Sequence, residues 1–365
     1  MASNIFVADD VMNNGQTDQA SSPKGDVTVA YHDQDQQSAV TARPRVIVTM
    51  TAQEEMLAPL AFADVVRLPG PTARADSQEM IAKLLPTTSA VLSQGDMRID
   101  NDVLERSPHL RIVANMSRGY DNFDLEAMTA HGVWATNVPD AFTEPTAEVT
   151  FGLILMVMRR LAEGSAHVRN GEWQHFEPGR WDGVSLNGKT LGIIGYGNIG
   201  RAVARIARAF EMNVLCAQRS PVHDENVTQC SLDELLTRSD VISLHVPLSA
   251  ETEHLINTEA LARMKPNAIL INTARGGVVD EEALTTALQS GRLAGAGLDV
   301  TEREPHVEPA LYSLPNVVIT PHLGGGTSES RKESQAHAVA NVVAVLQGGT
   351  PQQPLNTIPP TPRDG

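Results

Sequence analysis

Three ionisable residues in the second half of the sequence could together reduce a carbonyl group. Arg275, Glu304 and His322 each follow a short apolar run of the kind that forms a buried strand. A guanidinium can clamp a carboxylate through two hydrogen bonds and polarise a neighbouring carbonyl. A histidine can supply a proton to the carbonyl oxygen, and a glutamate beside it favours the imidazolium form. These residue types predict a site that binds an organic acid and transfers a proton to it.

A glycine-rich motif precedes these three residues. Gly195, Gly197 and Gly200 form the pattern G-x-G-x-x-G between an apolar run at 191–194 and an Ala/Arg-rich helical segment. In that context the pattern predicts dinucleotide binding. The first glycine permits a tight turn, the second lets the backbone approach a pyrophosphate, and the third allows close packing of helix on strand. The amides around Asn198 and Ile199 would then face the phosphates at a helix N-terminus.

The residues after the next apolar run favour NADP(H) over NAD(H). An acidic residue about 20 positions after the motif would bind the ribose 2′-hydroxyl of NAD. The sequence instead has Gln218, Arg219 and Ser220 there, with no carboxylate until Asp224. Arg219 and Ser220 can hold a 2′-phosphate through a guanidinium and a hydroxyl. We therefore expect NADP(H) to be preferred and NAD(H) to be possible; the alternative is that Arg219 is a solvated loop cation at an unselective site.

Alternating apolar and helical segments must position these residues. Ten runs are predicted strands: 46–50, 91–93, 112–115, 133–137, 191–194, 214–217, 241–245, 268–272, 296–300 and 317–320. Helical patterns lie between most of them, for example at 200–210, 232–237 and 281–290. Such alternation indicates parallel sheets in the α/β class. Ligands of these sheets bind beyond the carboxyl ends of the strands, so Arg275, Glu304 and His322 are expected to face one cleft.

Two longer helices are expected to join the two series of strands. The pattern predicts one continuous helix over 144–163, with Thr143 as its N-cap, as the link between the sheets. A second amphipathic helix over 328–346 follows the last predicted strand. We expect this helix to return and pack on the first domain.

Composition excludes several classes of function. The chain has 365 residues with 28 Lys and Arg against 44 Asp and Glu, a net charge of −16, which argues against nucleic acid and anionic membranes as partners. Residues 1–44 are acidic and Gln-rich and are predicted to be a disordered leader, and the Pro-rich residues 348–365 a disordered tail. Two cysteines, no secretory pattern and no apolar run long enough to span a membrane predict a cytoplasmic protein.

The ordered series of motifs resembles the D-isomer-specific 2-hydroxyacid dehydrogenases. The matching segments are 195–200, Asn272-Thr-Ala-Arg-Gly276, Gly297-Leu-Asp-Val300 leading to Glu304-Pro305, and Thr320-Pro-His-Leu-Gly-Gly325. The resemblance implies two doubly wound parallel-sheet domains, with a Rossmann cofactor domain (143–322) inserted in a flavodoxin-like substrate domain (45–142 and 323–347). It also implies a homodimer. No histidine spacing indicates a metal site, so none is expected.

The resemblance also implies a role for individual residues. Arg275 would bind the substrate's carboxylate and carbonyl, His322 would be the general acid/base, and Glu304 would be its partner. Asp299 matches the family's ligand of the nicotinamide carboxamide. Further residues match cofactor-binding positions, namely Thr146, His245, Val246, Pro247, Thr273, Ala274, Arg275, His322 and Gly324. The implied reaction is hydride transfer to C2 of a small anionic 2-oxo acid such as glyoxylate, hydroxypyruvate or a sugar-derived keto acid.

A glycine loop in the first domain refines the expected substrate. Gly119 matches a loop whose amides bind the substrate carboxylate, and Arg118 beside it adds a cation that would favour a more anionic substrate. The alternative is that Arg118 simply pairs with an acid such as Asp121. Because 118–148 resembles the phosphite dehydrogenases of the family, phosphite oxidation is the alternative reaction. A dinucleotide-sensing corepressor, a binding protein with the same fold and the same three residues, is the alternative from a different class.

Overall fold

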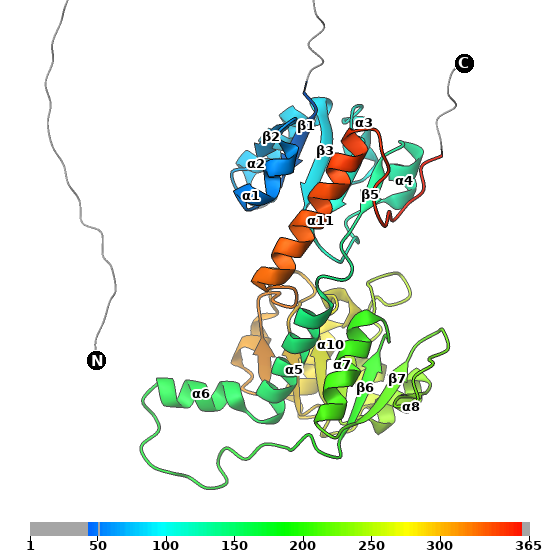
Figure 1. The fold of residues 1–365 in the computed structure, drawn as a ribbon. Helices are drawn as coiled ribbons and strands as arrows, with labels where there is room; N and C mark the ends of the chain where they lie inside the picture. The colour runs from blue at the N-terminus through cyan, green and yellow to red at the C-terminus, as the bar shows by residue number, and fades with distance from the viewer. Residues whose placement is uncertain (1–42, 50–51, 360–365) are drawn as a thin grey trace, which may run out of the picture. The chain divides into compact units, whose positions relative to one another are not determined.

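The structure, a computed structural model, describes residues 43–49 and 52–359 of the chain (Figure 1). The predicted disordered leader lies outside the described residues, apart from Arg43 and Pro44. Within the described part of the chain, no helix is both long enough and apolar enough to cross a bilayer.

A five-stranded parallel sheet holds the first series of strands in the order β2-β1-β3-β4-β5. This is the flavodoxin-like order, with its switch point between β1 and β3. The strands are β1 (Arg45–Val48), β2 (Asp64–Arg67), β3 (Thr88–Ser93), β4 (Ile112–Asn115) and β5 (Trp134–Thr136). The helices that belong with this sheet are α1 (Glu54–Leu57), η1 (Ala58–Leu60), α2 (Ala75–Leu84), η2 (Leu85–Thr87), α3 (Asn101–Glu105), α4 (Leu125–Ala130) and α11 (Ser328–Leu346).

A seven-stranded parallel sheet holds the second series in the order β12-β11-β10-β9-β6-β7-β8. Read from β8, this is the Rossmann order with one further strand at the edge. The strands are β6 (Thr190–Ile194), β7 (Asn213–Ala217), β8 (Thr228–Gln229), β9 (Val241–Leu244), β10 (Ile269–Asn272), β11 (Gly295–Leu298) and β12 (Val317–Ile319). The remaining helices are α5 (Thr143–Met158), α6 (Leu161–Arg169), α7 (Asn198–Ala209), α8 (Leu232–Arg238), α9 (Thr258–Arg263), η3 (Gly276–Val278), α10 (Glu281–Gln289) and η4 (Pro309–Ser313).

The predicted α/β class with two doubly wound parallel sheets is confirmed. Each of the ten predicted strands falls on an observed strand, with ends that differ by up to three residues, and Met50 lies outside the described residues. The sequence missed β2 and β8, which lie at sheet edges and bury little of their surface. The missed strands therefore lack the buried apolar run on which the prediction depended.

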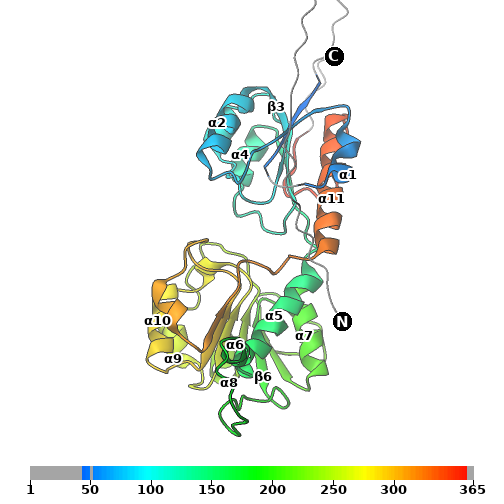
Figure 2. The same cartoon turned by 90° about the vertical axis from the view of Figure 1, so that its left-hand side faces the viewer.

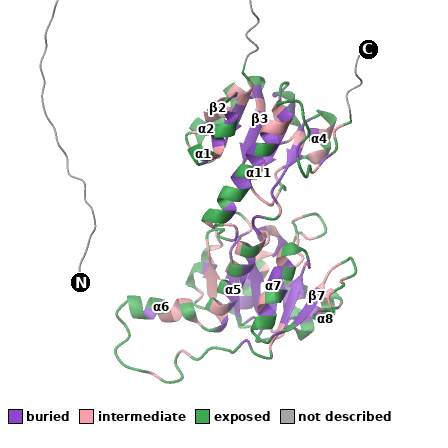
Figure 3. Ribbon diagram, in the orientation of Figure 1, coloured by how far each residue is buried: buried purple, intermediate pink, exposed green. Residues whose placement is uncertain are grey.

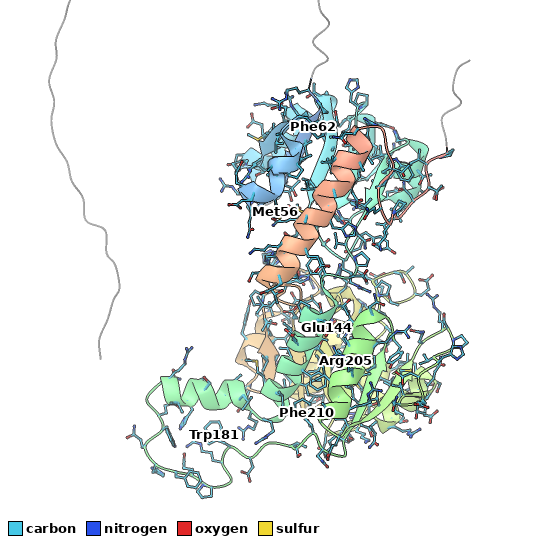
Figure 4. The ribbon with its side chains drawn as sticks, in the orientation of Figure 1. Met56, Phe62, Glu144, Trp181, Arg205 and Phe210 are labelled. Carbon is cyan, nitrogen blue, oxygen red and sulfur yellow. The ribbon has the colours of Figure 1, made fainter. Side chains whose placement is uncertain are left out.

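Helices cover both faces of the seven-stranded sheet. Figure 2 shows α9 and α10 on one face and α5 and α7 on the other. Two apolar clusters fill these interfaces, and the strands between them are buried (Figure 3). At the surface, Glu144 of α5 and Arg205 of α7 point toward each other and form an ion pair (Figure 4). The ring of the buried Phe151 of α5 stacks on Phe210, which follows α7, with 5.4 Å between the ring centroids. These contacts hold α7, which starts directly after Gly197 of the glycine motif, against α5, the helix that links the two sheets.

The continuous helix predicted over 144–163 is wrong, because the structure has two helices there. Arg160 adopts a left-handed backbone (φ 54°), which a right-handed helix cannot continue. The carbonyl of Met158 at the end of α5 accepts a hydrogen bond from Val184 N at 2.8 Å, so the returning chain occupies the end of the helix. The N-cap is Phe142, and Thr143 is the first helical residue. These contacts join residues far apart in sequence, so the helical pattern could not reveal the break.

Helix α11 returns to the five-stranded sheet, as predicted. It contacts β3 and β4 and lies along the face of this sheet (Figure 1). Its buried residues Ala338, Val339, Val342 and Val345 join the apolar cluster that includes Val46 of β1. The chain therefore passes from the first sheet to the second through α5 and back through the segment before α11.

Residues 348–359 are ordered against β5, whereas the prolines predicted a disordered tail. Leu355 N donates to Ala135 O at 2.8 Å, and Asn356 Oδ1 accepts from Ala135 N at 2.9 Å. Asn356 Nδ2 donates to Val133 O at 2.9 Å and to Thr129 Oγ1 at 3.1 Å. The edge of β5 exposes backbone groups that need partners, and an extended Pro-rich segment can supply them.

Asn356→Ala should destabilise this edge. The substitution leaves the amide of Ala135 and the carbonyl of Val133 without their side-chain partner, which costs about 1–3 kcal/mol for buried polar groups. A lower urea midpoint of the unfolding transition is expected relative to the unmodified chain. Gln352→Ala, which removes an exposed side chain from the same segment, is the matched control. Equal midpoints for both variants would mean that the segment contributes nothing to the fold.

Candidate active site

A cavity of about 1210 Å³ lies at the carboxyl ends of strands from both sheets. Fourteen of the predicted site residues line it: Arg118, Gly119, Thr146, Ile199, His245, Val246, Pro247, Thr273, Ala274, Arg275, Asp299, Glu304, His322 and Gly324. The other predicted residues, Gly195, Gly197, Asn198, Gly200, Gln218, Arg219 and Ser220, are not among its lining residues. The structure thus brings the proposed proton-transfer residues and the proposed substrate residues into one space.

His322 and Glu304 form a close pair in this cavity. His322 Nδ1 lies 2.9 Å from Glu304 Oε2, and Glu304 Oε1 accepts from Thr301 N at 3.2 Å. The hydrogen bond and charge of Glu304 raise the pKa of His322, although burial opposes the shift. Burial raises the pKa of Glu304, but the hydrogen bond and charge of His322 outweigh it and leave that pKa lowered. The pair therefore favours imidazolium beside carboxylate.

The loop that carries His322 is held by Asp299. The Asp299 side chain accepts hydrogen bonds from Thr320 Oγ1, Leu323 N and Gly324 N, each at 2.7 Å. His322 N donates to the Asp299 backbone carbonyl at 2.9 Å. His322 has φ 54°, a left-handed conformation that is uncommon for a residue other than glycine. The buried carboxylate of Asp299 thus fixes the backbone from which the imidazole extends.

Arg275 lies against the glycine loop of the five-stranded sheet. Its Nε donates to Asp121 Oδ1 at 3.0 Å, and its Nη1 donates to the Ala274 carbonyl at 2.8 Å. A Cβ atom at Gly119 would lie 1.5 Å from Arg275 Nη2, so only a glycine leaves room for the guanidinium here. Ser117 Oγ and Asn115 Nδ2 both donate to the Gly119 carbonyl at 3.0 Å and hold the loop.

Arg118 does not pair with Asp121, so that alternative is wrong. Its Nη1 donates to the carbonyl of Pro139, just before α5. Burial lowers the pKa of Arg118, the charge of Asp140 opposes this shift, and the charge of Arg275 adds to it. The two arginines therefore lie close enough to repel each other, and an anion between them would be stabilised.

His245 lies beside Arg118 and is neutral. Its Nε2 lies 2.8 Å from Ser243 Oγ, and its backbone N donates to Ile194 O at 2.8 Å. Burial, with a contribution from the charge of Arg118, lowers its pKa to about 3. His245 thus contributes a polar but uncharged wall to the cavity.

The three glycines of the motif have different surroundings. Gly195 has φ 94°, and a Cβ there would lie 2.8 Å from the His245 carbonyl. A Cβ at Gly200 would lie 2.3 Å from the Gly195 carbonyl oxygen, so this position packs against the strand. A Cβ at Gly197 would meet no other atom within 4 Å, which leaves the backbone before α7 open to an approaching group. This arrangement fits a pyrophosphate at the N-terminus of α7.

The residues after β7 form an exposed turn. Gln218 Oε1 accepts from Tyr196 N at 3.0 Å, and Gln229 Nε2 donates to the carbonyls of Gln218 and Ser220. The side chains of Arg219 and Ser220 are exposed. Asp224 accepts a hydrogen bond from Tyr196 Oη at 2.7 Å, so the first carboxylate after β7 already has a partner.

Sequence reasoning missed several residues of the cavity. Gln94 and Gly95 line it and follow directly after β3. The rule that ligands bind at the carboxyl ends of strands, applied to the first sheet as well as the second, would have found them. Asp121 was considered only as a partner of Arg118. Its contact with Arg275 joins two sheets, and no local pattern predicts that contact. Among residues 43–49 and 52–359, no cluster of three or more His, Cys, Asp or Glu residues could hold a metal ion.

Comparison with known proteins identifies the family. Residues 151–324 match the model for the NAD-binding domain of D-isomer specific 2-hydroxyacid dehydrogenases. A glyoxylate reductase from Thermococcus litoralis is 46% identical over 71% of this chain and 81% of its own length, and one from Thermococcus kodakarensis is 42% identical over 86% and 96%. A crystal structure of an NADPH-dependent glyoxylate/hydroxypyruvate reductase from Sinorhizobium meliloti, in complex with NADP and malonate, has 33% identity and a TM-score of 0.76 over 86% of this chain and 97% of that one. The chain therefore belongs to the D-isomer-specific 2-hydroxyacid dehydrogenase family and is an NAD(P)-dependent oxidoreductase that acts on a CH–OH group.

Proposed function

We propose that this enzyme is an NADPH-preferring reductase of small 2-oxo acids, with glyoxylate and hydroxypyruvate as substrates. The observation that carries the proposal is the convergence of Arg275, the Gly119 loop and the His322–Glu304 pair on one cavity. The names of the relatives above support the substrate class.

Each side chain has a chemical task in this reaction. The bound coenzyme supplies a hydride to C2 of the substrate. Arg275 and the Gly119 loop bind the substrate carboxylate, and Arg118 adds positive charge on the same side of the cavity. Glu304 engages Nδ1 of His322, so Nε2 is the nitrogen that donates a proton to the carbonyl oxygen. The hydrogen bond and charge of Glu304 raise the pKa of His322, which favours the form that carries this proton.

We propose the following assignment of the two sheets. Residues 45–142 and 323–347 form the substrate domain, and residues 143–322 form the dinucleotide domain. The residues that would hold the coenzyme are Thr146, Gly195, Gly197, Asn198, Ile199, Gly200, Gln218, Arg219, Ser220, His245, Val246, Pro247, Thr273, Ala274, Arg275, Asp299, His322 and Gly324. Asp299 already accepts three hydrogen bonds, and a carboxylate offers about four lone-pair sites, so capacity for a carboxamide remains.

The preference for NADPH rests on the turn after β7. Arg219 and Ser220 are exposed there, and Asp224 is engaged by Tyr196 Oη. The carboxylate of Asp224 is therefore already engaged and is not offered to a ribose 2′-hydroxyl. The guanidinium of Arg219 and the hydroxyl of Ser220 are available to a 2′-phosphate. A homodimer and a cytoplasmic location remain predictions. Phosphite oxidation is not favoured, because the relatives above are named for glyoxylate or for glyoxylate and hydroxypyruvate.

A substrate and coenzyme panel tests the proposal. Glyoxylate and hydroxypyruvate should be reduced faster with NADPH than with NADH, and phosphite should give no reduction of NAD⁺ or NADP⁺. Arg219→Ala should raise KM for NADPH about tenfold, the loss of one charge-assisted contact to phosphate, with little change for NADH. Arg238→Ala, which removes an exposed arginine paired with Glu234 on α8, is the control. A clear preference for NADH in the unmodified enzyme would contradict the assignment of Arg219.

Arg275→Ala should reduce kcat/KM for glyoxylate by at least about two orders of magnitude. This loss corresponds to ~3 kcal/mol of transition-state stabilisation from a charged, orienting contact. Steady-state kinetics with saturating NADPH would measure it, with Arg106→Ala, directly after α3, as a control that removes an exposed arginine. Kinetics of Arg275→Ala equal to those of the unmodified enzyme would remove Arg275 from the mechanism.

Glu304→Gln should change the pH dependence of reduction. Reduction needs protonated His322, so kcat/KM should fall as pH rises through the His322 pKa, which Glu304 raises above 6.5. Without the negative charge the His322 pKa drops, and the fall in activity should move to lower pH. Glu302→Gln is the matched control, because Glu302 contacts His254 at 3.2 Å instead of His322. An unchanged pH profile for Glu304→Gln would show that Glu304 does not set the protonation of the acid.

A further inference from the structure

We propose that Asp121 is an internal counter-ion of Arg275 that competes with the substrate carboxylate and thereby sets substrate affinity. This inference rests on the proposed role of Arg275 as the residue that binds the carboxylate. The contact joins two sheets, because Asp121 follows β4 and Arg275 follows β10, 154 residues apart in sequence.

The contact with Asp121 occupies one of the two forks that Arg275 can offer to a carboxylate, the fork formed by Nε and Nη2. Nε is bound to Asp121 at 3.0 Å, and Nη1 is bound to the Ala274 carbonyl at 2.8 Å. The third nitrogen, Nη2, lies against Gly119, where a Cβ would be 1.5 Å away. A carboxylate clamped by two parallel hydrogen bonds needs two adjacent nitrogens. Nη1 keeps a second N–H, but the fork formed by Nε and Nη2 can take the substrate carboxylate only after the Asp121 contact opens.

The contact with Asp121 is the one that opens more readily. The side chains of Arg275 and Asp121 are 30% and 49% exposed, and exposed ion pairs contribute little because water screens them. Releasing Nη1 would instead leave the Ala274 carbonyl without its partner in a partly buried position. When the Asp121 contact opens, Nε and the adjacent Nη2 become free together. These two nitrogens form one of the forks that match a carboxylate.

Asp121 is also the cavity carboxylate suited to such an exchange. Of the three other carboxylates that line the cavity, Asp299 accepts three hydrogen bonds from its loop, and Glu304 is bound to His322 and Thr301 N. The third, Glu302, is bound to His254 and accepts from Glu281 N. Among the described residues, the Asp121 carboxylate forms its hydrogen bond and its ion pair with the same partner, Arg275. The loop that carries Asp121 is held from other positions, since Asn122 accepts from Asn115 Nδ2 at 2.9 Å and donates to Met97 O at 2.8 Å. Asp121 can thus release Arg275 while the loop keeps its place.

The exchange has a consequence for selectivity. Asp121 compensates the charge of Arg275, which also lies near Arg118. An anion that binds to the fork of Nε and Nη2 must replace this carboxylate. An anion with only one weak acceptor gains less binding free energy than an anion that fills the fork of Arg275 and also binds the amides of the Gly119 loop. Asp121 therefore discriminates against simple anions at the cost of a higher KM for the substrate.

Asp121→Asn tests the inference. The expected result is a KM for glyoxylate that falls about threefold or more, with kcat changed by less than twofold, since the competing charge is lost. The Kd of malonate, a non-reacting carboxylate probe measured by calorimetry on the enzyme with NADPH bound, should fall by a similar factor. Inhibition by chloride should become stronger. Asp121→Glu, which keeps a carboxylate able to reach Arg275, should restore KM toward that of the unmodified enzyme.

Controls separate this inference from the proposed function. Asp102→Asn on α3 makes the same charge change at an exposed position and should leave KM unchanged. If Arg275→Ala raises KM but Asp121→Asn leaves it unchanged or raises it, Asp121 does not compete with substrate and the inference is overturned. If Arg275→Ala has no effect on KM or on malonate binding, Arg275 does not bind the substrate carboxylate and the proposed function itself is contradicted. Thermal unfolding of each variant confirms that it is folded.

Discussion

The buried carboxylate of Asp299 is the contact on which the arrangement of this active site depends. It is 1% exposed, and it accepts hydrogen bonds from Thr320, Leu323 and Gly324. These bonds compensate the cost of burying the charge and hold His322 in a left-handed conformation. The same loop leads directly into α11, which packs on the five-stranded sheet. Asp299 therefore positions the proton donor and also anchors the return of the chain from one sheet to the other.

The net charge of −16 does not describe the cavity. Arg118, Arg275 and Arg331 line it, and each of its four carboxylates, on Asp121, Asp299, Glu302 and Glu304, is engaged by a donor. An anionic substrate would thus meet arginines in a protein whose overall charge is negative. Because surface charges more than about 10 Å away are screened by salt, the charged groups that line the cavity, and not the net charge, govern anion binding.

Local patterns predicted the strands and the residues that follow them, because a buried parallel strand is a continuous apolar run and the chemistry lies at its carboxyl end. The break after α5 and the ordered segment 348–359 were not predictable in this way. Each depends on a backbone contact between distant residues, Met158 with Val184 in one case and Ala135 with Leu355 in the other. Proline content gave the wrong expectation for 348–359, since an extended segment can be either free or paired along a sheet edge.

The hydrogen-bond partners of Arg118 and Arg275 show most clearly what the sequence could not reveal. Arg118 and Asp121 are close in sequence, and pairing between them was the alternative to a role of Arg118 in substrate binding. The structure instead attaches Arg118 to the Pro139 carbonyl and pairs Asp121 with Arg275 of the other sheet. A bond to a backbone carbonyl holds its arginine in place, whereas a bond to an exposed carboxylate can be exchanged for another anion. Arg118 and Arg275 therefore differ in their freedom to bind substrate, and that difference follows from tertiary contacts and not from residue type.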